Sequence, residues 1–145
     1  MPVPTPIGVG PKYQPRPAMH APCAVIGGAP AKRVHLELFA NGFAIVIPAR
    51  VGVRSADCRA HEWTTAPTGV VHFDRAARLG SVFAVWGMPL GRRGLLSFHG
   101  VVSLFRNGLR VRGDPRDLPL RNGDELVLET GPFIPPHRSY LFPPP

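Results

Sequence analysis

The chain has 145 residues, 44% of them hydrophobic, and its 17 basic and 9 acidic residues give a formal net charge of +8 at pH 7. This length fits one domain with one modest core, and no apolar run reaches the roughly 18–20 residues of a membrane-spanning helix. A basic chain favours nucleic acid or other polyanions as partners, although arginine together with proline, glycine and alanine is also typical of a GC-rich genome.

Proline marks both ends of the chain. Eight of the 19 prolines fall in residues 1–30 and six in residues 132–145. Because proline fixes φ and removes a backbone donor, we expect an extended arm at 1–31, a single globular domain at 32–131 and a proline-rich tail at 132–145. The apolar piece 18–31 lacks a basic leader and is interrupted by proline, so the default expectation is a cytoplasmic protein without a signal peptide.

The two cysteines, Cys23 and Cys58, allow one disulfide. No C-x-x-C spacing suggests thiolate metal ligation. Without an export signal, two buried free thiols are the favoured interpretation, and the sequence leaves open whether the pair is bridged.

Two hairpins are predicted from Asn-Gly pairs that lie between runs of alternating apolar residues. Asn41-Gly42 and Asn107-Gly108 both tolerate the positive φ values of a type I′ turn, which is the strongest short-range hairpin signal. The predicted strands are residues 34–40 and 43–48 for the first hairpin, and 101–105 and 109–111 for the second.

One helix is expected between the hairpins. Its apolar stripe at i, i+3, i+4 and i+7 consists of Leu79, Val82, Phe83 and Trp86. We expect Asp74 to cap or charge its N-terminal end, and Gly87 to end it.

Two further strands complete the expected fold, at residues 70–73 and 125–129. The order hairpin, strand, helix, hairpin, strand favours an α+β fold in which a small mixed β-sheet packs on one helix. This layout is similar to a β-grasp. A small all-β barrel or sandwich is the alternative.

Histidines are the only candidate metal ligands, with His35, His61 and His72 as the three weak candidates. No two histidines have the i, i+4 or H-x-H spacing that places two imidazoles on one ion. A metal site therefore requires the fold to bring distant segments together, and isolated structural or surface histidines are the favoured interpretation. We expect no cofactor.

Several short motifs lie in a common order. The chain has Cys58, T-G-V-V-H ending at His72, L-G-S-V-F ending at Phe83, Trp86-Gly87, and R-G-D-P-R ending at Arg116. These motifs resemble, over residues 34–136, a family of uncharacterised actinobacterial and other bacterial proteins that are usually exported or membrane-tethered. That family carries C-x-x-x-L-H-T-H-D-x-x-G-V-I-H, L-G-Q-F-F-x-x-W-G and R-G-D-P-R.

The resemblance fails at one segment. Where the family has L-H-T-H-D, this chain has E-W-T-T-A at residues 62–66, so Trp63 and Thr65 replace two imidazoles and Ala66 replaces an acid. If the family binds a metal there, the resemblance implies that this chain has lost the site. The family has no established activity, so the resemblance implies relatives and not a function.

No nucleophile motif, phosphate loop or H-E-x-x-H is present, so we expect no enzymatic activity. The arginines are then the remaining candidate binding residues. Arg106, Arg110 and Arg112 share parity on the second hairpin and are expected to lie on one face, with Arg92 and Arg93 in a nearby loop. Such a face would bind phosphates or an acidic protein surface. A solvated hairpin face that is protected by its charge is the alternative.

Three functions from different classes remain. The favoured one is a non-catalytic protein-interaction or assembly module with proline-rich docking arms, which binds a protein partner or a second copy of itself. The alternatives are a binder of nucleic acid or another polyanion through the arginine face, and a degenerate metal-binding module that uses the histidines.

Overall fold

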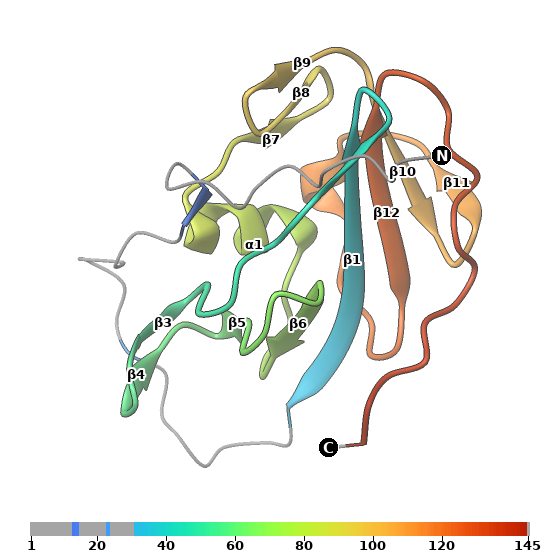
Figure 1. Ribbon diagram of the computed structural model, residues 1–145. Coiled ribbons are helices and arrows are strands. Elements are labelled where there is room, and N and C mark those ends of the chain that lie inside the picture. Colours follow the sequence, from blue (N-terminus) through green and yellow to red (C-terminus); the bar gives the residue numbers. More distant parts are fainter. Residues whose placement is uncertain (1–12, 15–22, 24–30, 145) are drawn as a thin grey trace, which may run out of the picture.

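A central pair of long strands organises the protein. The computed structural model describes residues 13–14, 23 and 31–144. It shows a mixed α+β fold that is mostly β-sheet (Figure 1). Strand β1 (Lys32–Ala40) runs parallel to the last strand, β12 (Glu125–Thr130), with His35 opposite Glu125. The mixed α+β prediction is confirmed, and the barrel alternative is wrong because the described strands form no closed barrel.

Shorter strands extend this pair on both sides. Beyond β12 lie β10 (Val102–Arg106) and then β11 (Leu109–Val111), and each is antiparallel to its neighbour. On the other edge of β1, β6 (Val70–Phe73) pairs with its first half and β2 (Phe43–Ile45) with its end. The remaining elements are β3 (Val53–Ser55), β4 (Cys58–Arg59), β5 (Glu62–Trp63, beside β6), β7 (Leu90–Gly91), β8 (Gly94–Leu95), β9 (Phe98–His99) and the short helix η2 (Pro115–Asp117).

Both predicted Asn-Gly hairpins are present. Asn41 and Asn107 have φ angles of 52° and 51°, and the glycines that follow have φ of 86° and 85°. Positive φ at both central residues matches the right-handed twist of the flanking strands. The first turn joins β1 to β2, and the second joins β10 to β11.

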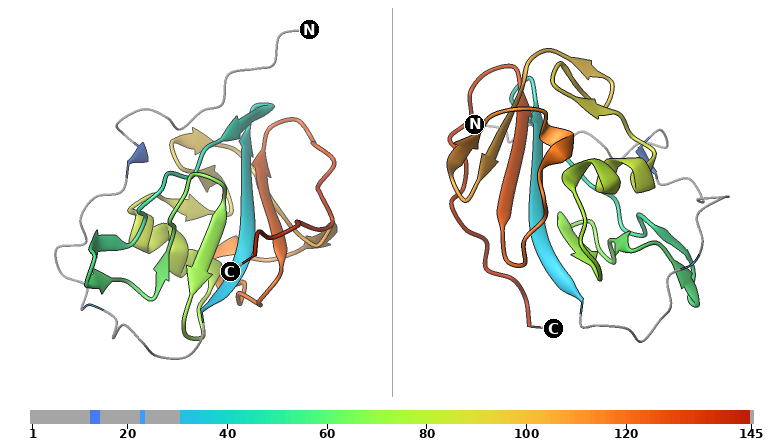
Figure 2. Two further views of the ribbon diagram at one scale, coloured as in Figure 1. Left: turned by 60° about the horizontal axis from the view of Figure 1, so that its bottom comes forward. Right: turned by 180° about the vertical axis from the view of Figure 1, so that it is seen from behind.

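The predicted helix, α1 (Leu79–Trp86), is also present. All four residues of its apolar stripe are buried, as predicted. The helix lies against one face of the sheet, seen in Figure 1 and from behind in Figure 2. Gly87 ends it with a φ of 81°, the left-handed conformation that glycine adopts without strain.

The expected role of Asp74 as the helix cap is wrong. The residue before the helix is Arg78, and its backbone N–H donates to Oγ of Ser81 at 3.2 Å. Asp74 lies one turn too early, and its carboxylate instead accepts from Arg59 at 3.0 Å and pairs with His61 at 2.6 Å. Those two bonds hold the pKa of Asp74 below its usual value against the opposing effect of burial.

The sheet has an inner face toward α1 and an outer face away from it. Alternate residues of β1 and β12, among them Leu36, Leu38, Leu126 and Leu128, belong to the hydrophobic core on the inner side. We call the opposite side the outer face. Its side chains are Arg33, His35, Glu37 and Phe39 of β1, Glu125, Val127 and Glu129 of β12, and Ser103 and Phe105 of β10.

The N-terminal arm is attached to the rest of the domain at two described points. Tyr13 is buried in the core, and its carbonyl oxygen accepts from the indole N–H of Trp86 at 2.7 Å. Cys23 forms a disulfide with Cys58, so the expectation of two free thiols is wrong. The cysteines lie 35 residues apart in the sequence, but the fold brings their Cα atoms to 4.9 Å. Residues 1–12, 15–22 and 24–30 of the predicted arm lie outside the described residues.

No helix among the described residues is both long enough and apolar enough to cross a membrane.

Candidate functional site

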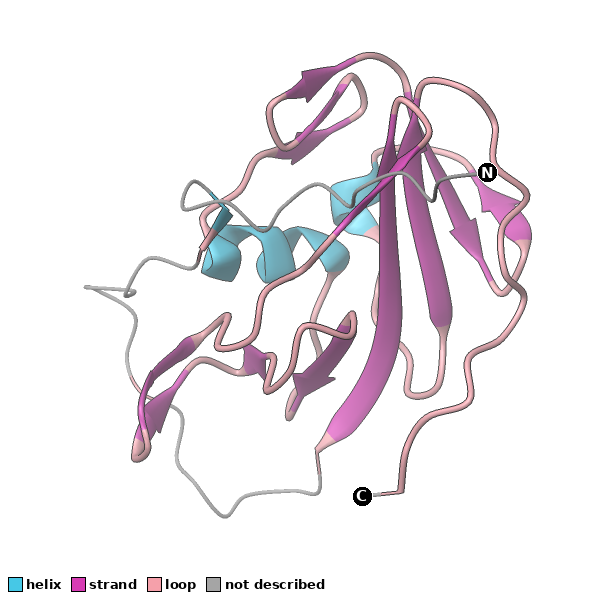
Figure 3. Ribbon diagram, viewed as in Figure 1, coloured by secondary structure: helices cyan, strands magenta, loops and turns pink. Residues whose placement is uncertain are grey.

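The C-terminal segment covers the outer face of the sheet. We call residues 131–144 the strap. It leaves the end of β12 and runs along the side of the sheet opposite α1, as both views of Figure 2 show. Figure 3 shows that it is loop along its whole length. Its attachment must therefore come from side chains and single hydrogen bonds, because it adds no strand to the sheet.

The first half of the strap is held by β10 and β12. The ring of Phe133 meets the ring of Phe105 edge-on, with centroids 6.0 Å apart. The backbone N–H of Ile134 donates to Glu129 at 3.0 Å. These contacts cover the second face of β12, which explains why every residue of that strand is buried.

The second half of the strap follows β1 in the opposite direction. His137 pairs with Glu37 at 2.8 Å, and the Tyr140 ring stacks on His35 with centroids 3.6 Å apart and planes within 4°. Arg33 then lies over the ring of Phe142 at 4.9 Å and donates to the Pro143 carbonyl at 2.6 Å. Arg33, His35 and Glu37, three successive outward residues of β1, thus each have a partner in the strap.

A cluster of two histidines and two glutamates lies where the strap meets the outer face, with His137 on the strap and the other three residues on the sheet. His35 and Glu125 are its buried members, Glu37 is mostly buried, and His137 is largely exposed. Nδ1 of His35 lies 2.9 and 3.1 Å from the two carboxylate oxygens of Glu125, and 3.9 Å from the nearer oxygen of Glu37. The parallel register that sets His35 opposite Glu125 creates the cluster.

Burial and pairing have opposite effects on the pKa values of these groups. Burial raises the pKa of Glu125, and the hydrogen bond between Glu125 and His35 opposes that rise. The hydrogen bond to Glu37 raises the pKa of His137, because the carboxylate favours the charged imidazole. Pairing with Glu37 therefore favours the charged form of His137.

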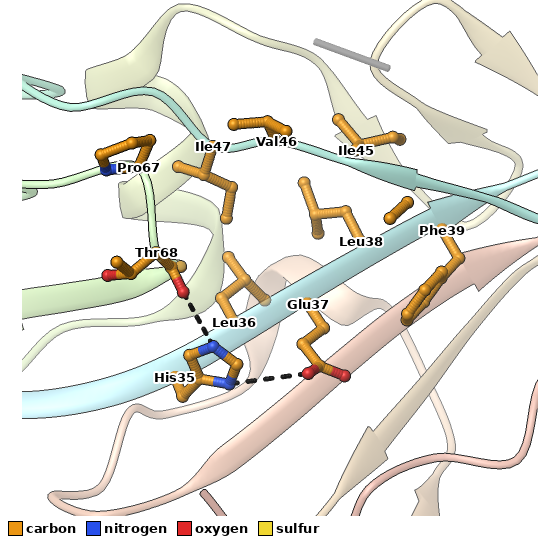
Figure 4. A pocket seen from close by; sticks show the side chains of 12 residues that line it. His35, Leu36, Glu37, Leu38, Phe39, Ile45, Val46, Ile47, Pro67 and Thr68 are labelled. Carbon is orange, nitrogen blue, oxygen red and sulfur yellow. Dashed lines mark hydrogen bonds and ion pairs between the residues drawn. The ribbon is translucent and has the colours of Figure 1, made fainter. Parts of the chain in front are cut away.

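A pocket of about 200 Å³ opens beside the cluster. It occupies the gap on the edge of β1 between β2 and β6. In the described part of the chain, one backbone bond crosses this gap, from the Leu36 N–H to the Gly69 carbonyl at 2.8 Å. Figure 4 shows His35 and Glu37 on one side of it and the apolar side chains of Ile45, Val46 and Ile47 on the other. The pocket thus combines an apolar wall with one polar side.

The three predicted metal ligands are not brought together. His35 joins the cluster described above, whereas His61 pairs with Asp74. His72 stacks on Trp63 with ring centroids 5.4 Å apart. Burial, with smaller contributions from Arg33 and Arg59, lowers the pKa of His72 and so favours its neutral form.

The predicted arginine face is wrong in one member. Arg106 is opposite Leu109, whereas Arg110 is opposite Phe105. Across a two-residue turn, positions i and i+3 share a face, so Arg106 and Arg110 lie on opposite faces of the hairpin. Arg106 is instead paired with Asp124 at 3.2 Å and donates to a backbone carbonyl, which leaves it poorly placed for a polyanion.

The other predicted arginines, Arg92, Arg93, Arg110 and Arg112, are exposed. Two of them, Arg92 and Arg112, line a shallow hollow of about 360 Å³ together with Asp114 and Asp117. Asp114 is paired with Arg116 at 2.6 Å, and hydrogen bonds from Arg116 lower its pKa to about 2. Carboxylates between the arginines weaken the attraction of this surface for phosphate.

Glu129 gives a pH-dependent prediction. It is 3% exposed, and one of its oxygens has no hydrogen-bond partner among the described residues. Burial raises its pKa, so the folded state holds the proton more tightly than the unfolded state and the protein loses stability as pH rises through that raised value. Glu129→Gln, which keeps an acceptor for Ile134, should raise the free energy of unfolding at pH 7 by about 1 kcal/mol.

The gain from Glu129→Gln should vanish near pH 4, where the unfolded carboxyl is itself protonated. Urea unfolding at several pH values measures it. Asp57→Asn, a charge removal at an exposed site, is the matched control and should change little. A gain that is equal at pH 4 and pH 7 would exclude ionisation of Glu129 as the cause.

Sequence reasoning missed most of the site. Glu37, Glu125, His137 and Tyr140 were not among the candidates. The available signal was the alternation of His35 and Glu37 with leucines in β1, because polar residues at every second position of a central strand mark a face that needs a partner.

Comparisons with protein-family models, curated proteins and solved structures find no match for this chain.

Proposed function

We propose that this protein is a non-catalytic interaction module whose outer face binds an extended, proline-rich segment with aromatic anchors. The occupant is the strap, either of the same chain or of a second copy. The observation that carries this proposal is the series of contacts along β1, in which Glu37, His35 and Arg33 each hold a successive strap residue.

The chemistry of these contacts supports recognition of a segment rather than simple coverage of a core. A charged pair, a stacked ring and a cation–π contact each require a particular side chain at a particular spacing. Proline reduces the conformational freedom that a segment loses on binding. Because the strap forms no strand pairs, it can leave the face without breaking the sheet.

We also infer a β-grasp-like arrangement for the domain. The strand order β2–β1–β12–β10–β11, with its central parallel pair and one helix over the inner face, supports it. Strands β5 and β6 then form an addition on the same edge of β1 as β2, along the first half of β1 that β2 leaves unpaired.

An oxidising compartment suits this module. Disulfides persist mainly in exported and extracellular proteins, and Cys23 and Cys58 are bridged. We therefore favour the exported setting of the family that the motifs resemble over a cytoplasmic one.

The test is a competition for the outer face in the full-length chain. Tyr140→Ala/Phe142→Ala removes the stack on His35 and the contact with Arg33, so the strap should detach. A labelled peptide of residues 131–144 should bind this variant and bind the wild type at least about tenfold more weakly, since a tethered strap competes at an effective concentration of about millimolar.

Leu141→Ala is the matched control, because that side chain is 94% exposed within the same strap. It should bind the peptide as weakly as the wild type does. Fluorescence anisotropy gives the affinities, and the solution mass of each variant reports strap exchange between copies. Failure of the peptide to bind the double variant, or equal binding to all three proteins, would rule out the proposal.

A further inference from the structure

The hydrogen bonds of His35 leave a place for a cation. Its Nε2 lies 2.9 Å from the Thr68 carbonyl oxygen, and because a carbonyl only accepts, Nε2 carries the ring hydrogen. In the neutral ring, Nδ1 then directs its lone pair at the carboxylate oxygens of Glu125, 2.9 and 3.1 Å away. Two acceptors this close require a positive species between them, which is either a proton or a metal ion.

Glu37 adds a third donor, and His137 lies beside Glu37 as a fourth candidate. Glu37 contributes a carboxylate next to His35 on β1, and the strap brings Nδ1 of His137 to 2.8 Å from that carboxylate. One ligand atom from each of His35, Glu37 and Glu125 can be chosen so that all three lie within 4.8 Å of one another. Two imidazoles and two carboxylates are a ligand set that zinc accepts.

The three sheet donors are spaced closely enough to share one ion, and the imidazole of His137 has to move toward them to complete a tetrahedron. Ligand atoms bound to Zn²⁺ at about 2.0–2.1 Å lie about 3.3 Å from one another. Three of the six donor pairs, His35–Glu125, His35–Glu37 and Glu37–His137, have separations of 2.9, 3.9 and 2.8 Å, which lie on either side of that value. Two carboxylates would balance the charge of a divalent ion, which matters because Glu125 is fully buried.

The surroundings resemble those of a ligand that is held in place. Metal-bound histidines usually donate their other ring N–H to a carbonyl or carboxylate, as His35 does to Thr68. The stacked ring of Tyr140 fixes the plane of the His35 imidazole from above. The side chain of His137 is 67% exposed, which gives an ion a route from solvent to the buried donors.

We propose that His35, Glu37, Glu125 and His137 form a divalent-metal site, best suited to Zn²⁺, that fastens the strap to the outer face. Three of the donors come from the sheet and one from the strap, so a bound ion links the two. This site is distinct from the E-W-T-T-A segment at residues 62–66. It goes beyond the proposed function, and it can be present whether or not the strap exchanges between copies.

The experiment is a Zn²⁺ titration of the full-length, chelator-treated protein by calorimetry. The wild type should bind one ion per chain, and its thermal midpoint should rise with Zn²⁺ concentration. Glu37→Gln and His137→Ala should each weaken Zn²⁺ binding by at least about tenfold. Both residues are partly exposed, so these variants should fold, which circular dichroism checks.

His99→Ala is the matched control, an exposed histidine on β9, and it should leave the affinity unchanged. Absence of stoichiometric binding to the wild type would overturn the site. So would binding that survives both Glu37→Gln and His137→Ala, because it would then come from other residues. The peptide competition is run in chelator, so its outcome is independent of this one.

Discussion

Replacing Trp86 with alanine should lower the free energy of unfolding by about 3–5 kcal/mol, the usual range for removing a fully buried tryptophan. Its side chain is among the largest fully buried ones in the described structure, and it packs against Phe83 with ring centroids 5.7 Å apart. The indole N–H also donates to the Tyr13 carbonyl, so the truncation loosens the attachment of the N-terminal arm as well. Urea unfolding followed by circular dichroism measures the loss.

Trp86→Phe separates the two contributions. It keeps most of the apolar surface but removes the donor for Tyr13, and the loss of one hydrogen bond to a buried carbonyl should cost about 1–2 kcal/mol. If both variants are as stable as the wild type, α1 does not pack on the sheet as described.

Removing the disulfide should have an effect of similar size. Cys23→Ser/Cys58→Ser opens a loop whose ends lie 35 residues apart, and the chain-entropy relation gives a loss of about 4 kcal/mol. A reducing agent should produce the same loss in the wild type and none in the double variant. Two thiols that react with a thiol reagent in the native, unreduced protein would show that the bridge is absent.

Local chemistry accounts for the parts of the fold that were predictable. The Asn41-Gly42 and Asn107-Gly108 turns follow from the few residues that tolerate positive φ, and α1 follows from a stripe with helical period. Both signals lie within a dozen residues of sequence. Neither depends on which strands meet later.

The unpredicted parts depend on contacts between distant residues. The parallel pairing of β1 with β12 brings His35 to Glu125 across 90 residues, and no local pattern gives that register. The sequence predicts only a proline-rich tail where the strap lies. The residues that anchor the strap, such as Tyr140, find their partners only on the folded sheet. The burial of Tyr13 was not predicted, and the pairing of Cys23 with Cys58 was left open, for the same reason.

Parity also misleads at a tight turn. Counting odd and even positions through Asn107-Gly108 places Arg106 and Arg110 together, but a two-residue turn reverses the relation. The same count is correct within β1 and β12, where no turn intervenes. Polar residues at alternate positions there identify the outer face once the strand is known to be central.

The most direct test of the account is the nuclear magnetic resonance signal of the Tyr140 and His35 rings in the full-length protein. Rings stacked at 3.6 Å should give cross-relaxation between their protons and strong upfield shifts, which Tyr140→Ala removes and Leu141→Ala preserves. In a sample that mixes labelled and unlabelled chains, intermolecular cross-peaks would place the strap on a second copy. Random-coil shifts for Tyr140, with no contact to His35 within or between chains, would contradict the claim that the outer face binds the strap.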